Sequence, residues 1–180
     1  MESETKLTRK WVLDPTHSEL TFKVKHMMIT NVKGEFKDFS IDIDGDDIFT
    51  SGINVLIEAS SLNTNSEQRD AHLKSADFFD VENHKELSFK STSFKQTSGS
   101  DYELKGILSI KGISKELTLA AEFGGTNKDP WGNEKAGFSI SGKINRKDWG
   151  LNWNAALETG GVLVSEDVRI SAEIQFVKQS

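Results

Sequence analysis

The run SELTFKVKHMMI, residues 18–29, decides the fold class, because apolar and polar side chains alternate along it. A period of two is typical of a β-strand with one buried face, since successive side chains of a strand point to opposite faces. The residues of this run that we expect to face the interior are Leu20, Phe22, Val24, His26 and Met28. A protein built on such strands buries one face of a sheet.

The same alternation recurs along most of the chain and predicts about eight long strands. The other alternating runs lie near residues 36–44, 53–59, 86–95, 102–112, 116–123, 137–144 and 167–176. The residues of these runs that we expect to face the interior include Val55, Ile57, Phe89, Leu108, Ile110, Phe138 and Ile140. Gly106 and Gly142 fall on the same apolar faces, where they either leave an open lumen or are filled by large neighbours.

The breaks between the runs have the composition of turns and short loops. They are DGDD (44–47), SGSD (98–101), KGIS (111–114) and GGTNKDPWGN (124–133). Such short connections favour antiparallel pairing. Strands of roughly ten residues exceed the usual five or six and favour a barrel over a small sandwich. The sequence therefore predicts an all-β protein, an antiparallel barrel of about eight strands, which is wide enough either to be filled by side chains or to hold one ligand.

One segment breaks the alternation, and there we expect a short helix over about residues 66–76. Within RDAHLKSADFFD (69–80), helical spacing places on one face Arg69, His72, Leu73 and Ala76. Ser66 is suited to the N-cap position, and Asp70 and Lys74 have the spacing of a weak ion pair. Phe78 and Phe79 follow the helix. This arrangement predicts a helix that caps the barrel.

Length and charge limit the classes of function. The chain has 180 residues, enough for one domain with a core, and its net charge of −6 disfavours a nucleic-acid backbone or an anionic membrane as the main partner. We expect residues 1–10 to form a flexible tail and residues 11–180 a single domain. No apolar run reaches the roughly 20 residues that span a bilayer, so no stable membrane insertion is expected.

The first residues, MESETKLTRKWVLD, have no apolar core and no small-residue cleavage site. The expected location is therefore the cytoplasm, or the periplasm or extracellular space if a signal segment has been removed. The chain has no cysteine, which excludes disulfides and thiolate chemistry.

The sequence offers no pattern for a metal, a cofactor or a nucleophile. The four histidines have no zinc-binding spacing, and DIDGDD (42–47) lacks the acidic twelfth residue of a calcium loop. Neither a nucleophile elbow nor a dinucleotide or phosphate loop is present. We expect no metal and no cofactor.

The segment DWGLNWN (148–154) contributes Trp149 and Trp153, and Trp131 lies nearby in sequence. Tryptophan suits positions with one apolar and one polar side, such as the rim of a barrel. The residues alone leave two roles open, which are stacking on a ligand and closure of one end of the barrel.

With these residues assembled, the sequence resembles the YceI-like family of bacterial lipid-binding proteins. The resemblance rests on DPTHS (14–18), RDAHL with DFFD (69–80), LSIKGISKELTL (108–119) and DPWGNEKAGFSISGKINRKDWGLNWN (129–154). It covers nearly the whole chain. One departure is NHKELSF (83–89), where relatives commonly have an aromatic residue followed by proline, and it puts the entry to that strand in doubt.

The resemblance implies an elongated, lipocalin-like barrel of eight strands with a helix across one region. It also implies a long apolar ligand in the lumen, such as a polyisoprenoid, an isoprenoid quinone or a fatty amide, and no established catalysis. The residues then expected to contact the ligand are Phe22, Val24, His26, Met28, Val55, Ile57, Arg69, His72, Leu73, Phe78, Phe79, Phe89, Leu108, Ile110, Phe138, Ile140, Trp149 and Trp153.

The leading hypothesis is thus non-catalytic binding, storage or transport of a long-chain lipid. One alternative is an enzyme that acts on such a lipid with His17 or His72 as acid or base. Another is a stress-related structural or interaction protein. Arg69 and Asp70 either face a lipid head group or anchor the helix, and a homodimer that shelters the ligand is a further expectation.

Overall fold

A computed structural model of the chain describes residues 11–154 and 163–179. The expected flexible tail, residues 1–10, lies outside the described residues. The described chain forms one strongly curved sheet in which every pair of neighbouring strands is antiparallel. The predicted all-β, antiparallel class is confirmed.

The sheet has eleven strands rather than the eight predicted. They are β1 (Trp11–Leu13), β2 (Glu19–His26), β3 (Thr30–Phe36), β4 (Phe39–Ile43), β5 (Ile53–Glu58), β6 (Leu62–Asn63), β7 (Glu86–Ser98), β8 (Asp101–Ile110), β9 (Ile113–Lys128), β10 (Glu134–Asn145) and β11 (Val164–Lys178). The sequence missed β1 and β6 because they are too short to show a period. It missed β3 because the run TNVKGEF is mostly polar and has Gly34 in its interior.

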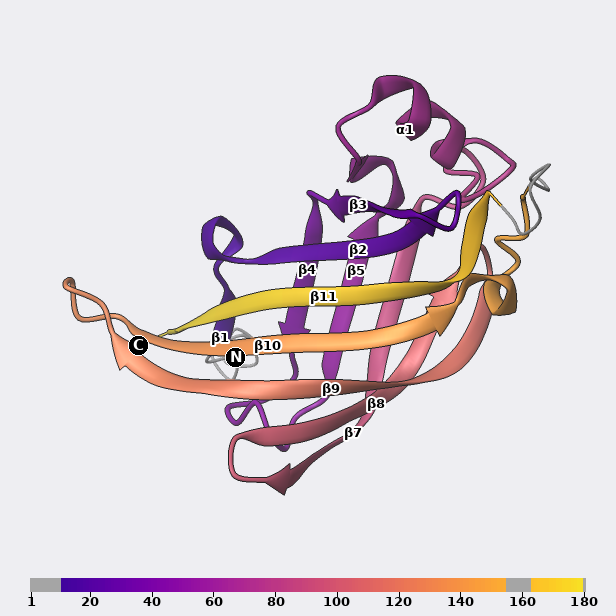
Figure 1. The fold of residues 1–180 in the computed structure, drawn as a ribbon. Helices are drawn as coiled ribbons and strands as arrows, with labels where there is room; N and C mark the ends of the chain where they lie inside the picture. The colour runs from indigo at the N-terminus through magenta and orange to yellow at the C-terminus, as the bar shows by residue number, and fades with distance from the viewer. Residues whose placement is uncertain (1–10, 155–162, 180) are drawn as a thin grey trace.

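The strand order is β4-β5-β7-β8-β9-β10-β11-β2-β3-β6, and β1 pairs with β11. In Figure 1 the sheet folds over on itself, so that β2, β9, β10 and β11 form one wall and β4, β5, β7 and β8 cross behind them as the other. No ladder joins β4 to β3 or β6 within the described part of the chain, so the sheet is a half-barrel with two edges. Strand β1 lies against β4 near this gap.

The predicted loop over residues 124–133 is too long. Strand β9 continues to Lys128, and β10 begins at Glu134. The glycines did not end the strand because Gly125 pairs with Gly137 across a β-bulge, where the absence of side chains lets the ladder continue. The resulting long hairpin supplies one wall of the interior.

The helix α1 (Glu67–Lys74) confirms the element expected between the strands, and it lies beyond the β3 edge in Figure 1. Ser66 is its N-cap, and the Ser66 hydroxyl accepts a hydrogen bond from the Arg69 backbone N–H at 3.3 Å. The prediction of an Asp70–Lys74 ion pair is wrong, since no such pair occurs among the described contacts. Asp70 Oδ1 instead accepts hydrogen bonds from the backbone N–H and hydroxyl of Thr64, because β6 ends beside the helix.

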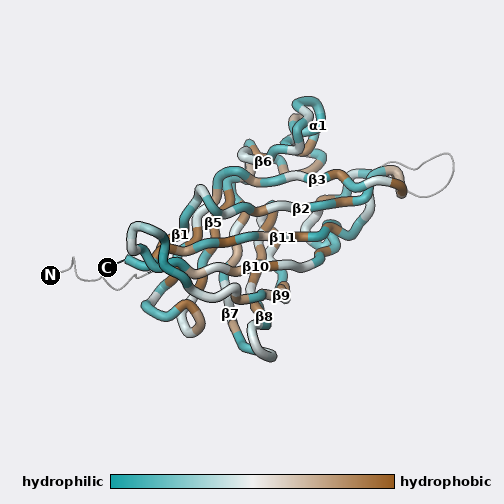
Figure 2. The backbone as a smooth tube through the Cα atoms, turned by 60° about the vertical axis from the view of Figure 1, so that its left-hand side comes forward, coloured by the Kyte–Doolittle hydropathy of each residue, from teal (hydrophilic) through white to brown (hydrophobic). Residues whose placement is uncertain are grey.

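Three 3-10 turns complete the described fold: η2 (Pro15–His17), η3 (Ala59–Ser61) and η4 (Arg146–Trp149). The β2–β3 turn forms one tip of the molecule, and hydrophobic colour gathers there in Figure 2. The inward glycines do not create the lumen. A Cβ on Gly106 would lie 2.5 Å from the Phe89 ring, and one on Gly142 would lie 2.4 Å from Leu119 Cδ2. Large neighbours fill both places.

Candidate ligand-binding cavity

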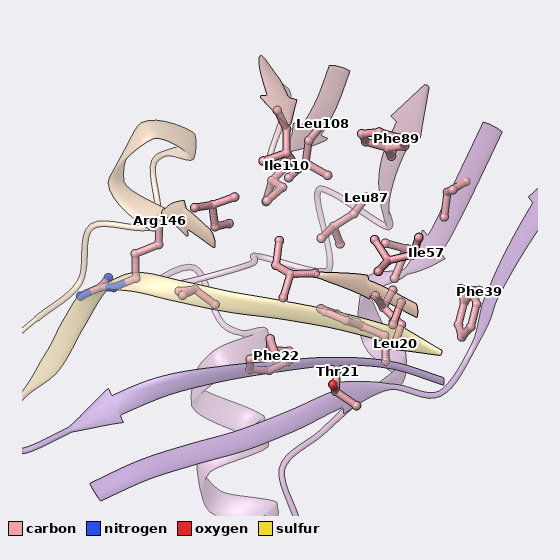
Figure 3. Close-up of a pocket in the computed structure, with 18 of the residues that line it drawn as sticks. Leu20, Thr21, Phe22, Phe39, Ile57, Leu87, Phe89, Leu108, Ile110 and Arg146 are labelled. Carbon is pink, nitrogen blue, oxygen red and sulfur yellow. The ribbon is translucent and has the colours of Figure 1, made fainter. Parts of the chain in front are cut away.

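A cavity of about 360 Å³ lies between the two walls of the sheet. Figure 3 shows its side chains converging from both sides, with Leu108, Ile110 and Phe89 on one wall and Leu20 and Phe22 on the facing strands. Its volume lies within the range of roughly 300–1,000 Å³ that is usual for small-molecule sites. The curvature of the long strands therefore encloses a space large enough for a ligand.

The cavity lining is almost wholly apolar. Forty described residues line it, and those with polar side chains, apart from the indole of Trp153, are Thr21, Lys25, His26, Arg69, His72 and Arg146. No carboxylate appears among these lining residues. A ligand that fits here gains free energy mainly from leaving water, because few groups are available for hydrogen bonds.

Most of the residues that the sequence assigned to ligand contact do line the cavity. Sixteen of the eighteen do so: Phe22, Val24, His26, Val55, Ile57, Arg69, His72, Leu73, Phe78, Phe79, Phe89, Leu108, Ile110, Phe138, Ile140 and Trp153. Ten of them lie on strands, where the structure confirms the inward orientation that period two determines. The other six come from α1 and from segments outside the strands. Their contact with a ligand stays a prediction.

Met28 and Trp149 are not in the lining. Strand β2 ends at His26, and Met28 lies in the following turn with 51% of its surface exposed. The strand period does not extend through a turn, which explains the error. Trp149 is buried at 3% exposure, and its indole N–H donates to the Leu108 carbonyl at 2.8 Å. The burial of Trp149 favours closure of one end of the barrel over stacking on a ligand.

One end of the cavity is closed by packed aromatic rings. Phe49, from the loop after β4, has its ring centroid 4.8 Å from that of Tyr102 and 5.6 Å from that of Phe94. Phe123 and Phe138 continue the cluster at a centroid distance of 5.1 Å. No charged side chain belongs to these ring contacts, so this end can meet only the apolar part of a ligand.

The opposite end gathers the polar groups of the lining other than Thr21, which pairs with Ser171 farther along the β2–β11 ladder. His72 Nε2 lies 2.8 Å from Asp77 Oδ2, and the His72 ring packs edge-on against Phe78 and Trp153. His26, at the end of β2, is paired with Val164 at the start of β11. Val164 and Phe176, both in the lining, lie twelve positions apart on β11, which corresponds to roughly 40 Å along the strand. The cavity is therefore long, with one apolar end and one polar end.

Arg146 is a lining residue that the sequence interpretation missed. Its side chain is 3% exposed, and it donates to the backbone carbonyls of Leu151, Trp153, Val164 and Ser165. Burial lowers the pKa of its guanidinium, and nearby Glu166 partly opposes this effect. Figure 3 shows Arg146 at one end of the lining, and its guanidinium carbon lies 5.8 Å from the centroid of the Phe78 ring.

A usable signal for Arg146 was present in the sequence. The inward parity of Phe138, Ile140, Gly142 and Ile144 continues to position 146. An arginine in register with an apolar face is a candidate for an interior cation. The prediction stopped at Ile144, where the apolar residues end.

Arg69 lines the cavity but is also bound to the backbone around it. Its Nε donates to the Thr64 hydroxyl at 2.8 Å, and its Nη2 donates to the Thr64 carbonyl at 2.6 Å. Asp70 Oδ1 accepts a hydrogen bond from the backbone N–H of the same threonine. These contacts favour the anchoring role for Arg69 and Asp70 over a role at a head group.

His17 lies outside the cavity lining, which removes it from any reaction on a ligand held there. Its Nδ1 is 3.0 Å from Asp14 Oδ2, and the same carboxylate oxygen is 2.9 Å from Lys135 Nζ. Lys135 holds the pKa of Asp14 well below its ordinary value, and hydrogen bonds from His17 and Thr16 contribute to this effect. The DPTHS segment thus fastens the chain between β1 and β2 to β10.

The described residues contain neither a candidate metal site nor a membrane-spanning helix. No three histidine or acidic side chains there are placed to hold a metal ion. No described helix has the length and apolar character needed to cross a membrane.

Known proteins resemble this chain in sequence and in structure. The family model for the YceI-like domain matches residues 11–176. A UPF0312 protein of Staphylococcus epidermidis is 39% identical over 170 residues, which cover 93% of this chain and 96% of the relative. A crystallised YceI protein of Campylobacter jejuni has a TM-score of 0.74 at 33% identity and covers 87% of this chain and 90% of its own. A polyisoprenoid-binding domain of Saccharophagus degradans has the same fold, with a TM-score of 0.67 at 14% identity over 95% of this chain and 99% of its own.

Proposed function

The chain belongs to the YceI-like family, and from this premise we propose that it binds one long-chain apolar lipid in the cavity and stores or carries it without chemical change. A polyisoprenoid or an isoprenoid quinone is the proposed ligand class. The description of the Saccharophagus degradans neighbour as polyisoprenoid-binding supports this class by analogy of fold. The observation that carries the proposal is the lining, in which long apolar walls contain no carboxylate.

The physical chemistry of the cavity is sufficient for binding. Burial of apolar surface contributes about 0.8 kcal/mol per CH₂ group, or roughly 3 kcal/mol for an isoprene unit before ordering costs. A few buried units therefore give useful affinity with little polar help. A branched isoprenoid chain also suits walls built from Ile, Leu, Val and Phe side chains.

The two ends of the cavity give the ligand a direction. We place the tail of the lipid at the aromatic end, around Phe94 and Phe138, because the side chains that line the cavity there are apolar. The head group then lies near His26 and His72, whose ring nitrogens are suited to oxygen-bearing groups. Arg146 adds positive charge at this end, while its N–H groups bind backbone carbonyls. Quinone, phosphate and amide heads all supply such oxygens.

Extraction of the purified full-length protein with organic solvent, followed by mass spectrometry, tests the proposal. A stoichiometric, intact long-chain lipid is the expected result. Recovery of a chemically altered lipid after incubation with a defined prenyl substrate would indicate turnover, with His72 as the titratable group in place. Protein that carries no lipid and takes none up on incubation would contradict carriage and turnover alike.

A further inference from the structure

The turn between β2 and β3 exposes three large apolar side chains beside the polar end of the cavity. Met27, Met28 and Ile29 are 44, 51 and 76% exposed. His26, directly before them, lines the cavity, and the Met27 N–H donates to the carbonyl of Leu163, which is also in the lining. We call residues 27–29 the apolar tip; it is the hydrophobic hairpin end visible in Figure 2.

The backbone of the apolar tip is poorly suited to methionine. The Ile29 N–H donates to the His26 carbonyl at 3.2 Å, so Met27 and Met28 are the two central residues of the turn. Both have positive φ, at 54° and 66°, in the left-handed region that favours Gly and Asn. Two central residues of this kind are typical of a type I′ turn, for which Asn-Gly is the preferred pair. Two methionines at these positions destabilise the isolated protein, because their backbone conformation is unfavourable and their apolar side chains are exposed to water.

Cations cross the outer face of the adjoining wall in a single row. Lys33 on β3 pairs with Lys23 on β2, Lys23 pairs with Arg169 on β11, and Arg169 pairs with Lys143 on β10. All four side chains are exposed. Like charges placed directly opposite one another destabilise a sheet. We call these four residues the basic row.

Few acidic groups neutralise the basic row. Among the described contacts, Lys23, Lys33 and Arg169 make no ion pair, and Lys143 Nζ is 3.8 Å from Asp167 Oδ2. Lys25 adds a further exposed cation between the row and the apolar tip. The net charge of the chain is −6, so the basic row is a local exception to the overall charge. The same outer face carries Glu35, Asp167 and Glu173 outside the row.

We propose that the apolar tip and the basic row form a docking surface for an anionic lipid bilayer. The tip enters the interfacial region, where its side chains leave water, and the basic row faces the anionic head groups. The exposed apolar tip and the adjacent like charges of the basic row are both unfavourable in the isolated protein. Contact with an anionic bilayer stabilises both. Docking at this place brings the polar end of the cavity to the bilayer, so the inference extends the proposed function with a route for lipid exchange.

Vesicle flotation with the full-length protein tests the docking surface. The protein is expected to float with vesicles of phosphatidylcholine mixed with phosphatidylglycerol, much less with phosphatidylcholine alone, and less again as salt rises. The double variant Met27→Asn/Met28→Gly installs the preferred type I′ pair, so its stability should be unchanged or higher. Its affinity for the mixed vesicles should fall at least ~tenfold, because two apolar side chains no longer leave water.

The charge contribution has a matched control. Lys23→Gln/Arg169→Gln should weaken binding to the mixed vesicles, whereas Lys95→Gln/Lys128→Gln, with the same change in net charge on β7 and β9, should bind like the wild type. Lys95 and Lys128 are exposed and lie outside the basic row. Equal loss in both variants would overturn the assignment of the charge effect to the row.

Other outcomes also overturn the proposal. They are a wild-type protein that does not float with the mixed vesicles, and a Met27→Asn/Met28→Gly variant that floats as well as the wild type. Concentration-dependent dimerisation that this variant abolishes, without vesicle binding by the wild type, would assign the tip to a second copy of the chain. Lipid content after solvent extraction is measured separately, so an empty cavity and a failure to dock remain distinguishable.

Discussion

Gly106 shows how one missing side chain shapes the wall of the cavity. A Cβ at this position would lie 2.5 Å from the Lys90 carbonyl oxygen and 2.5 Å from the Phe89 ring. The carbonyl belongs to a paired strand and cannot move freely, so Gly106→Ala should destabilise the protein by about 1–3 kcal/mol. Urea unfolding measures this change.

Gly137 provides the control for that substitution. It also lies in a strand, but a Cβ there would meet nothing within 4 Å, and its φ is not positive. Gly137→Ala should therefore be neutral or slightly stabilising, by at most about 1 kcal/mol. Equal effects of the two substitutions would show that the contacts around Gly106 do not constrain the wall.

Asp14 predicts a pH-dependent part of the stability. Its pKa is lower in the folded chain than in the unfolded chain, chiefly because of Lys135. The contribution is therefore complete above the ordinary aspartate pKa of roughly 4 and is lost as the pH falls below it. Asp14→Asn should cost about 1–2 kcal/mol at pH 7, and the difference from wild type should shrink at pH 3. A difference that is constant with pH would exclude the Lys135 contact as the cause.

At the scale of elements, α1 was predictable because its signals are local. The loss of alternation and the Ser66 cap lie within a few residues of one another. Its anchoring was not predictable, because Thr64 lies before the helix and carries no signal of a partner for Arg69 or Asp70. Strands β1 and β6 were likewise missed, since pairing with β11 and β3 defines them and their own residues do not.

The contacts of Arg69 predict that its removal lowers the stability of the protein and does not selectively weaken the binding of one ligand. Arg69→Ala removes both hydrogen bonds to Thr64 and should lower the free energy of unfolding by roughly 1–3 kcal/mol. Binding of a prenyl phosphate and of a neutral prenyl quinone should then weaken to a similar degree. Gln68→Ala, at an exposed neighbouring position, is the control and should change neither quantity. Selective loss of the phosphate ligand would instead place Arg69 at the head group.

At the scale of the whole molecule, period two predicted the inward residues of the long strands, but the closure of the interior depends on contacts distant in sequence. The aromatic end brings Phe49 against Phe94, Tyr102, Phe123 and Phe138 from four other segments. The polar end brings η4 and α1 together around Phe78, which contacts Arg146 and His72. No local pattern in the sequence predicts these contacts between distant segments. The open edge between β4 and β6 is also a property of the whole sheet, which strand patterns do not reveal.

The space between the two walls is the proposed site of the long-chain lipid. Ile57 lies in the cavity lining at 7% exposure, whereas its neighbour Leu56 points to the outer face at 46%. Ile57→Trp adds bulk to the cavity at an overpacking cost of about 1–3 kcal/mol, and Leu56→Trp adds the same bulk outside it.

Native mass spectrometry of the wild type and both variants, loaded with the same prenyl quinone, tests this assignment of the lipid to the cavity. We predict one lipid per chain in the wild type and in Leu56→Trp, and a marked loss of bound lipid in a folded Ile57→Trp protein. Equal lipid occupancy in the wild type and both variants would contradict the assignment of the ligand to the cavity.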